Sequence, residues 1–247
     1  MDEKLQFNFN QFKSLMNDKW DDSKILEQAN IIAVKDKAIR KGENVLHIEY
    51  LGGLLSDEDL IEFEVELKKI GIELSLHDKK GVQYGSLEEL SGVVTGILSS
   101  DITNNILTGV VGNAVWSGLC KVWVLIYKKL KGKQITTITE GGHSKLKEAT
   151  MSIVLYLNPV ASIEYNLKGD FDNEAEALET FIKILENAKS LLVNKLPSES
   201  FVAEANFESK LVEIIDVEKF FRDKMEKQKE NEKKIKLKKS ANKKRKK

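Results

Sequence analysis

The chain has 247 residues, enough for one large domain or two small ones with a buried core that needs no disulfide or metal ion. A hydrophobic share of 41% and a charged share of 32% are typical of a soluble globular protein, and they exclude a disordered chain and a multi-span membrane protein. Cys120 is the single cysteine and the first residues lack the pattern of a signal peptide, so we expect a cytoplasmic protein.

The net charge is zero, but the charged residues are unevenly distributed along the chain. Residues 222–247 contain fourteen Lys or Arg and four acidic residues, which gives this segment a net charge of +10. From totals of 39 basic and 39 acidic residues, 25 and 35 remain for residues 1–221, a net charge of −10. An acidic body followed by a basic segment indicates an anionic partner, although such a segment can also rest on its own body.

Residues 1–85 are predicted to form an N-terminal α/β part. Helical spacing of apolar residues predicts a helix over roughly residues 24–41, and the apolar run Val45–Leu51 predicts a buried strand. A capping box at Ser56 begins a helix, and the alternating residues Ile72–Leu76 predict a half-exposed strand. Because short links join strand, helix and strand, we expect a βαβ unit with parallel strands.

Residues 86–132 are the most apolar part of the chain and predict a hydrophobic helical hairpin from Leu87 to Leu130. In the first arm, apolar residues between Leu87 and Ile97 recur at helical spacing after a capping box. Ser100 can cap the second arm, which is predicted to continue as one helix over residues 102–130.

The second arm of this hairpin contains 22 mostly apolar residues, 106–127, which is long enough to cross a bilayer. Lys121 argues against insertion, since a lysine near the centre of a spanning helix costs about 2.5–3.5 kcal/mol. A stripe of small and polar residues, one every four positions, instead predicts close packing against protein: Gly109, Asn113, Ser117 and Lys121. Together with Trp116 and Trp123 of the same helix, these are the predicted interaction residues.

Residues 133–221 are predicted to form a β-β-β-α part with antiparallel strands. Gln134–Thr139 alternates with β-branched residues, and Met151–Leu167 predicts a hairpin that turns at Asn158 and Pro159. Helical spacing then runs from Glu174 to Pro197, and Lys210–Ile215 predicts a further strand. The predicted fold class is therefore α+β, or mixed α/β: an N-terminal βαβ part and a C-terminal antiparallel ββ(β)α part around the central hairpin.

Residues 222–247 are predicted to pass from helical to disordered. The last fifteen residues contain only three apolar side chains and no acid, too few apolar groups to form a core. Their basic side chains can neutralise phosphates or adhere to anionic lipid. The predicted anion-binding residues are Lys233, Lys234, Lys236, Lys238, Lys239, Lys243, Lys244, Arg245, Lys246 and Lys247.

Catalytic motifs are absent from the sequence: it has no phosphate-binding loop, no nucleophile elbow and no zinc-protease motif. One group of residues stands at the ends of the two predicted parallel strands, where α/β sheets bind ligands: Glu49, Asp78 and Lys80. Two carboxylates and a lysine could hold Mg²⁺ and cleave phosphodiesters, although residues 78–81 are also an ordinary polar turn. We predict no cofactor and no metal site.

The sequence therefore predicts a non-enzymatic cytoplasmic interaction protein. An apolar helical surface would bind a protein partner or a second copy, and the basic segment would bind an anionic partner such as nucleic acid. The first alternative is a membrane-associated protein, peripheral at the inner face of the membrane, that inserts the 102–130 helix in lipid. The second is a Mg²⁺-dependent nuclease-like enzyme.

Overall fold

The computed structural model describes residues 42, 44–79, 92–110, 113–138, 144–158, 161–193, 200–216 and 222. The predicted helix over residues 24–41, Lys80 and the basic residues from Lys233 onward lie outside these ranges. The described elements follow one another in the order β1 (Val45–Tyr50), α3 (Asp57–Lys68), β2 (Glu73–Asp78), β3 (Val94–Leu98), α4 (Ser100–Leu107), α5 (Asn113–Leu130), β4 (Gln134–Ile138), β5 (Ser144–Glu148), β6 (Met151–Tyr156), β7 (Ser162–Lys168), α6 (Glu174–Val193), β8 (Phe201–Asn206) and β9 (Leu211–Ile215).

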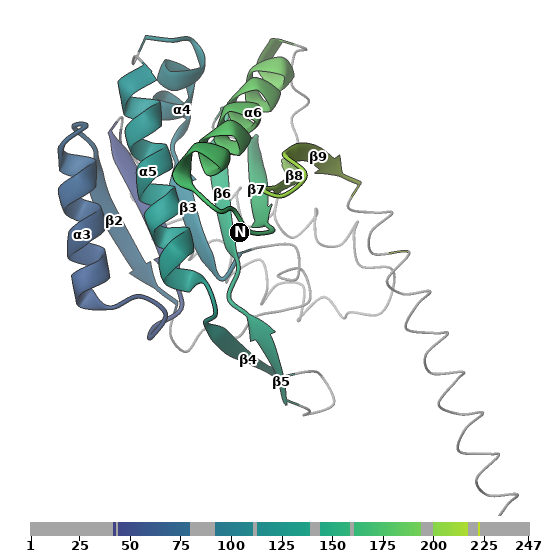
Figure 1. Ribbon diagram of the computed structural model, residues 1–247. Helices are drawn as coiled ribbons and strands as arrows, with labels where there is room; N and C mark the ends of the chain where they lie inside the picture. Colours follow the sequence, from purple (N-terminus) through teal and green to yellow (C-terminus); the bar gives the residue numbers. More distant parts are fainter. Residues whose placement is uncertain are drawn as a thin grey trace, which may run out of the picture.

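Seven of the strands form one mixed sheet in the order β2-β1-β3-β6-β7-β8-β9. It contains three parallel pairs, β1 with β2, β3 with β6 and β7 with β8, and each pair is joined through one or two helices. The parallel pairs are joined by antiparallel contacts between β1 and β3 and between β6 and β7. Strand β9 is the last strand of the sheet and runs antiparallel to β8. Helices α3, α5 and α6 lie side by side over one face of the sheet (Figure 1). This arrangement confirms the predicted α+β class.

The two faces of the sheet differ in what they contact. Gly96 of β3 lies against Trp123 of α5, and the Tyr165 hydroxyl of β7 donates to Asn187 of α6, so these strand residues face the helices. Because side chains alternate along a strand, Gly96 and Tyr165 fix the two faces, called here the helix face and the second face. The main core lies between the helix face and the helices, and its buried members include Leu46, Ile48, Phe63, Leu98, Trp123, Ile153, Tyr165 and Phe181.

The predicted βαβ unit is confirmed. Strands β1 and β2 pair in parallel with Val45 opposite Glu73, and α3 connects them. The capping box at the start of α3 is present: the Ser56 hydroxyl accepts from the Asp59 amide, and the Asp59 carboxylate accepts from the Ser56 amide. The predicted hairpin of β6 and β7 is confirmed as well, with Met151 opposite Leu167.

The first arm of the predicted helical hairpin is wrong where the structure describes it, because Val94–Leu98 is strand β3. All five residues are buried, since β3 lies between β1 and β6 and is covered on both faces. A strand buried on both faces is apolar at nearly every position, so its residues also match helical spacing. The β-branched residues Val94, Thr95 and Ile97 favour the strand.

The second arm is helical but not continuous over residues 102–130. Helix α4 ends at Leu107, and α5 begins at Asn113. Gly109 lies between them with a φ of 77°, a left-handed conformation that glycine adopts without strain. Within the described part of the chain, no helix is long and apolar enough to cross a membrane.

Strands β4 and β5 form a separate antiparallel hairpin, with Gln134 opposite Glu148. It projects from one end of the main sheet (Figure 1). The predicted strand over Gln134–Thr139 corresponds to β4, whereas β5 and β8 were not predicted. The predicted division of the chain near residues 85, 132 and 221 stays a prediction, and strands from either side of residue 132 belong to one sheet.

Candidate functional site

The predicted interaction residues of the apolar helix lie on different sides of α5. Trp116 and Trp123 are 7% and 0% exposed, and their rings meet edge to face with centroids 5.2 Å apart in the core. Ser117 and Lys121 are exposed on the opposite side of the helix. Gly109 belongs to the turn before α5, and Asn113 is the first residue of the helix. The apolar side of α5 therefore contacts the chain's own sheet and α6, and Ser117 and Lys121 of the polar stripe reach solvent.

The two carboxylates of the predicted catalytic group, Glu49 and Asp78, are not brought together, and Lys80 lies outside the described residues. Glu49 lies opposite His77 in the register of β1 and β2, whereas Asp78 lies opposite Tyr50. Since side chains alternate along each strand, Glu49 projects from the second face and Asp78 from the helix face. The lysine near Glu49 is Lys79, whose Nζ lies 3.7 Å from Glu49 Oε2. The two carboxylates thus stand on opposite faces of the sheet.

Glu49 instead belongs to a group of polar residues on the second face, at strands β2, β1, β3 and β6, of which Ser75 and His77 are half-buried and the others buried. His47 Nδ1 and Ser75 Oγ form a hydrogen bond of 2.9 Å, and the His47 and His77 rings stack with centroids 6.4 Å apart. Ser152 Oγ donates to Thr95 Oγ1 at 3.1 Å. This group is called the polar cluster: His47, Glu49, Ser75, His77, Lys79, Thr95 and Ser152.

The polar cluster contains residues that catalytic sites use, but its burial limits what it does in this conformation. A serine hydrogen-bonded to a histidine resembles a nucleophile with its base. His47 and Glu49 are almost completely buried, so a substrate from solvent does not reach them. The cluster therefore connects β1 to β2 and β3 to β6 through polar contacts and favours the register of each pair. Sequence reasoning missed it because Val45–Leu51 was predicted as a largely apolar strand, although His47 and Glu49 share one face of it.

The most exposed apolar edge of the sheet is strand β9. Among the described strands β9 pairs only with β8, so its outer backbone groups face away from the sheet. Leu211 is 54% exposed on the second face, and Ile214 is 44% exposed on the helix face. Glu213 lies directly opposite Glu204, whose carboxylate accepts from Lys168. β9 therefore combines exposed apolar side chains on both faces with one carboxylate, Glu213, on the second face.

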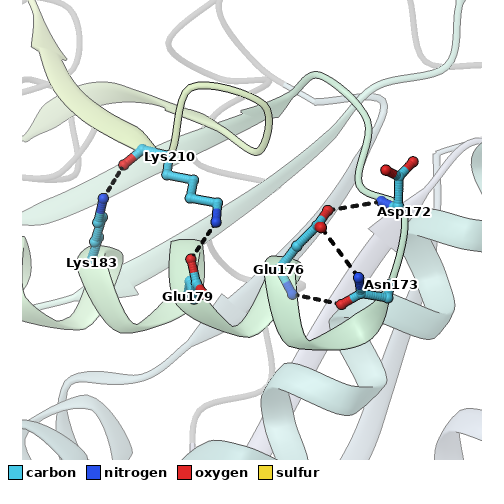
Figure 2. Close-up of polar contacts among 6 residues, drawn as sticks. All are labelled: Asp172, Asn173, Glu176, Glu179, Lys183 and Lys210. Atoms are coloured by element: carbon cyan, nitrogen blue, oxygen red, sulfur yellow. Dashed lines mark hydrogen bonds and ion pairs between the residues drawn. The ribbon is translucent and has the colours of Figure 1, made fainter.

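The beginning of β9 is tied to α6 through two lysines (Figure 2). Lys183 Nζ donates to the Lys210 carbonyl at 2.7 Å, and Lys210 Nζ forms an ion pair with Glu179. The hydrogen bond from Lys210 holds the pKa of the Glu179 carboxyl below its usual value. Lys210 has a φ of 55°, which is uncommon for a residue other than glycine. These contacts fix the turn that leads into β9.

The first turn of α6 stabilises the same region. The Asn173 side chain accepts from the Glu176 amide at 3.1 Å, and the Glu176 carboxylate accepts from the Asp172 amide at 3.1 Å (Figure 2). The side-chain nitrogen of Asn173, Nδ2, also donates to the Glu176 carboxylate at 3.2 Å. This reciprocal arrangement satisfies amide groups at the helix start that would otherwise lack a partner.

Comparison with protein-family models, curated proteins and solved structures finds no match for this chain. The surfaces and charges of the chain itself are therefore the evidence for its function.

In the described ranges, no three or more His, Cys, Asp or Glu side chains form a group that could hold a metal ion. Cys120 is buried in the core, and burial raises the pKa of its thiol far above the usual value. A thiol that stays protonated is a poor nucleophile, so Cys120 is a packing residue.

Proposed function

We propose that this chain is a non-enzymatic cytoplasmic interaction protein that binds nucleic acid through its basic segment, residues 222–247. The observation that carries the proposal is the separation of charge, +10 in this segment against −10 in residues 1–221. The acidic body repels the phosphate backbone of nucleic acid. The basic segment therefore supplies the electrostatic attraction to the phosphates.

The composition of the basic segment also supports the kind of binding proposed. Residues 233–247 contain ten Lys or Arg and no acid, and residues 222–247 contain no aromatic side chain. Lysine and arginine neutralise phosphates whatever the base sequence, whereas stacking on bases requires aromatic rings. We therefore expect binding that does not depend on base sequence and that weakens steeply with salt.

The body would contribute any contact with a protein partner or a second copy through its exposed side chains. The apolar side of α5 is occupied by the chain's own core, so such a contact needs another surface. On the outer side of α3, Ile61 and Val65 are 60% and 49% exposed and stand one turn apart. They are the exposed apolar pair on the helical layer that a partner would cover.

The test is the salt dependence of binding to a short DNA duplex, measured with the full chain. The triple variant Lys243→Gln, Lys244→Gln and Arg245→Gln should reduce the slope of log K against log salt by about 2 to 3, since each phosphate contact contributes about 0.9. A matched triple variant of exposed body lysines has the same change in charge: Lys121→Gln, Lys147→Gln and Lys189→Gln. This control should bind like the unchanged chain.

Equal weakening by both triple variants would contradict the proposal, and so would failure of the unchanged chain to bind duplex at low salt. Binding to vesicles of anionic lipid without binding to duplex would assign the basic segment to a membrane surface instead. The duplex should be recovered intact after incubation with Mg²⁺. Cleavage that is lost in an Asp78→Ala variant would favour the nuclease alternative.

A further inference from the structure

We propose that residues 234–238 of the basic segment add to the outer edge of β9 as a further strand of the same molecule's sheet. The strand addition stands independently of the proposed function, whereas its effect on nucleic-acid binding rests on that function.

The edge of β9 has the properties of a strand that accepts a neighbour. Among the described strands it has a partner on one side only, and it carries exposed apolar side chains on both faces. Natural sheets protect such edges with charges, prolines or bulges, or cover them with another segment. β9 has no proline and one charged residue, Glu213. We therefore expect the outer edge of β9 to be covered by another segment.

The two faces of β9 differ, and the difference defines the chemistry of its neighbour. Val212 and Ile214 lie opposite Ala205 and Ala203, which are buried beneath the helices, so this face is apolar. On the second face, Glu213 stands next to Glu204 and lies between the apolar Leu211 and Ile215 of its own strand. Glu204 already accepts from Lys168, so Glu213 is the carboxylate of this pair beside which an added cation would be stabilising. The neighbour should be apolar on the helix face and should place a cation beside Glu213 on the second face.

Residues 234–238 have this alternation, with the sequence Lys-Ile-Lys-Leu-Lys. In an extended conformation Ile235 and Leu237 project to one side and the three lysines to the other. If the two apolar side chains lie beside Val212 and Ile214, the lysines fall on the second face next to Glu213. Other parts of residues 222–247 have longer runs of charge and do not repeat this pattern.

The position of this segment along the chain favours pairing within one molecule. β9 ends at Ile215, and the segment begins at Lys234, so eighteen residues separate them. A fully extended link of this length spans up to about 60 Å, far more than a return to the adjacent edge requires. In general, a short flexible linker holds a tethered segment at an effective concentration of about millimolar. Pairing within one molecule therefore precedes pairing between molecules in dilute solution.

Strand addition would regulate the anion-binding function. A lysine held beside Glu213 is not available to phosphates, so nucleic acid has to displace the strand before it engages the whole basic segment. The acidic body and nucleic acid would then compete for the basic segment, and this competition would depend on salt. Variants that release the strand without loss of charge should bind nucleic acid more tightly.

The direct test is amide hydrogen exchange in β9 of the full chain. The double variant Ile235→Ser and Leu237→Ser keeps every charge but removes the apolar face of the added strand. We expect the outward amides of β9 to exchange at least about tenfold faster in this variant than in the unchanged chain. A matched double variant in the same segment, Met225→Ser and Ala241→Ser, should leave the exchange unchanged. Equal exchange in all three proteins would overturn the strand addition.

A second variant tests the same contact from the side of the sheet. Glu213→Lys places a cation where the proposal requires a carboxylate, and it should accelerate exchange of the same amides. Glu186→Lys, an exposed position on α6, has the same change in charge and should have no effect. Accelerated exchange in Glu186→Lys alone would overturn the assignment of the contact to β9.

The same measurements show whether the segment that covers the edge belongs to the same molecule or to a second copy. They also test the strand addition separately from the binding of nucleic acid. Protection of β9 that does not change with protein concentration supports pairing within one molecule, whereas protection that rises with concentration assigns the edge to a second copy and overturns it. Tighter duplex binding by the Ile235→Ser and Leu237→Ser variant supports the competition. If no variant binds duplex but protection of β9 depends on Ile235 and Leu237, the nucleic-acid proposal fails and the strand addition stands.

Discussion

Gly96 of β3 lies directly beneath the indole of Trp123 on α5. A Cβ built on Gly96 would come within 3.1 Å of Trp123 Nε1, closer than ordinary van der Waals contact. Trp123 is completely buried and also contacts Trp116 and Phe181, so its ring has little room to move. The absence of a side chain at Gly96 therefore sets how closely the most apolar helix approaches the sheet.

Replacement of Gly96 by alanine should destabilise the protein by about 1–3 kcal/mol, because an added methyl overpacks a filled core. The measurement is the free energy of unfolding in urea. In a Trp123→Phe background the smaller ring leaves space for the methyl, so Gly96→Ala should cost clearly less there. Equal costs in the two backgrounds would show that the glycine and the indole are not coupled.

The elements that sequence analysis predicted correctly are those with local signals. The capping box at Ser56 and the alternation of Met151–Leu167 depend on neighbouring residues, and both were found as predicted. Strand β3 was missed because a strand buried on both faces has no alternation to show. Its position between β1 and β6 depends on contacts across about fifty residues of chain, which no local pattern encodes.

The candidate site was predictable to the same limited degree. Residues 210–215 were predicted as a strand, and Leu211–Ile215 is β9. That β9 stands at the edge of the sheet follows only from the order of all seven strands. The pairing of Glu49 with Asp78 failed for a related reason: residues at the ends of adjacent strands share an edge, but a shift of one residue places them on opposite faces.

Asp59 should make stability depend on pH in the acid range. Burial raises the pKa of its carboxyl, but hydrogen bonds from Lys129 and from the Ser56 amide, with the charge of Lys129, outweigh burial and lower it. A lowered folded-state pKa gives stability that is present above the unfolded value of about 3.9 and is lost as pH falls through the folded value.

Asp59→Asn should therefore lower the free energy of unfolding at pH 7 and have little effect near pH 2. Urea unfolding of both proteins between pH 2 and pH 7 measures this difference. Glu186→Gln, at an exposed position on α6, serves as the control and should follow the unchanged chain at every pH. A constant difference between Asp59→Asn and the unchanged chain across the whole range would contradict the assignment.

The buried pair Glu49 and Lys79 should be costly to break from one side. Glu49→Leu or Lys79→Met alone leaves the other charge in a buried site, and such single changes cost about 3–5 kcal/mol. The double variant removes both charges and should recover most of the loss. Urea unfolding of the four proteins in this cycle gives the coupling energy, and additive losses would show that the two side chains act independently.

Lys210 should be replaceable by glycine with a gain in stability. Its φ of 55° costs about 1–2 kcal/mol for a residue with a Cβ, and glycine adopts this conformation freely. Two effects oppose this gain. The variant loses the exposed ion pair with Glu179, worth about 1 kcal/mol or less, and the glycine makes the unfolded chain more flexible, which lowers the free energy of unfolding. The backbone carbonyl that accepts from Lys183 remains.

We therefore expect Lys210→Gly to raise the free energy of unfolding by up to about 1 kcal/mol, and Lys210→Val to lower it by about 1 kcal/mol or more. Glu179→Gln removes the ion pair without a change in the turn, and its cost isolates that contribution. If Lys210→Gly lost more stability than Glu179→Gln, the contacts of the lysine side chain, rather than the backbone of the turn, would control how β9 begins.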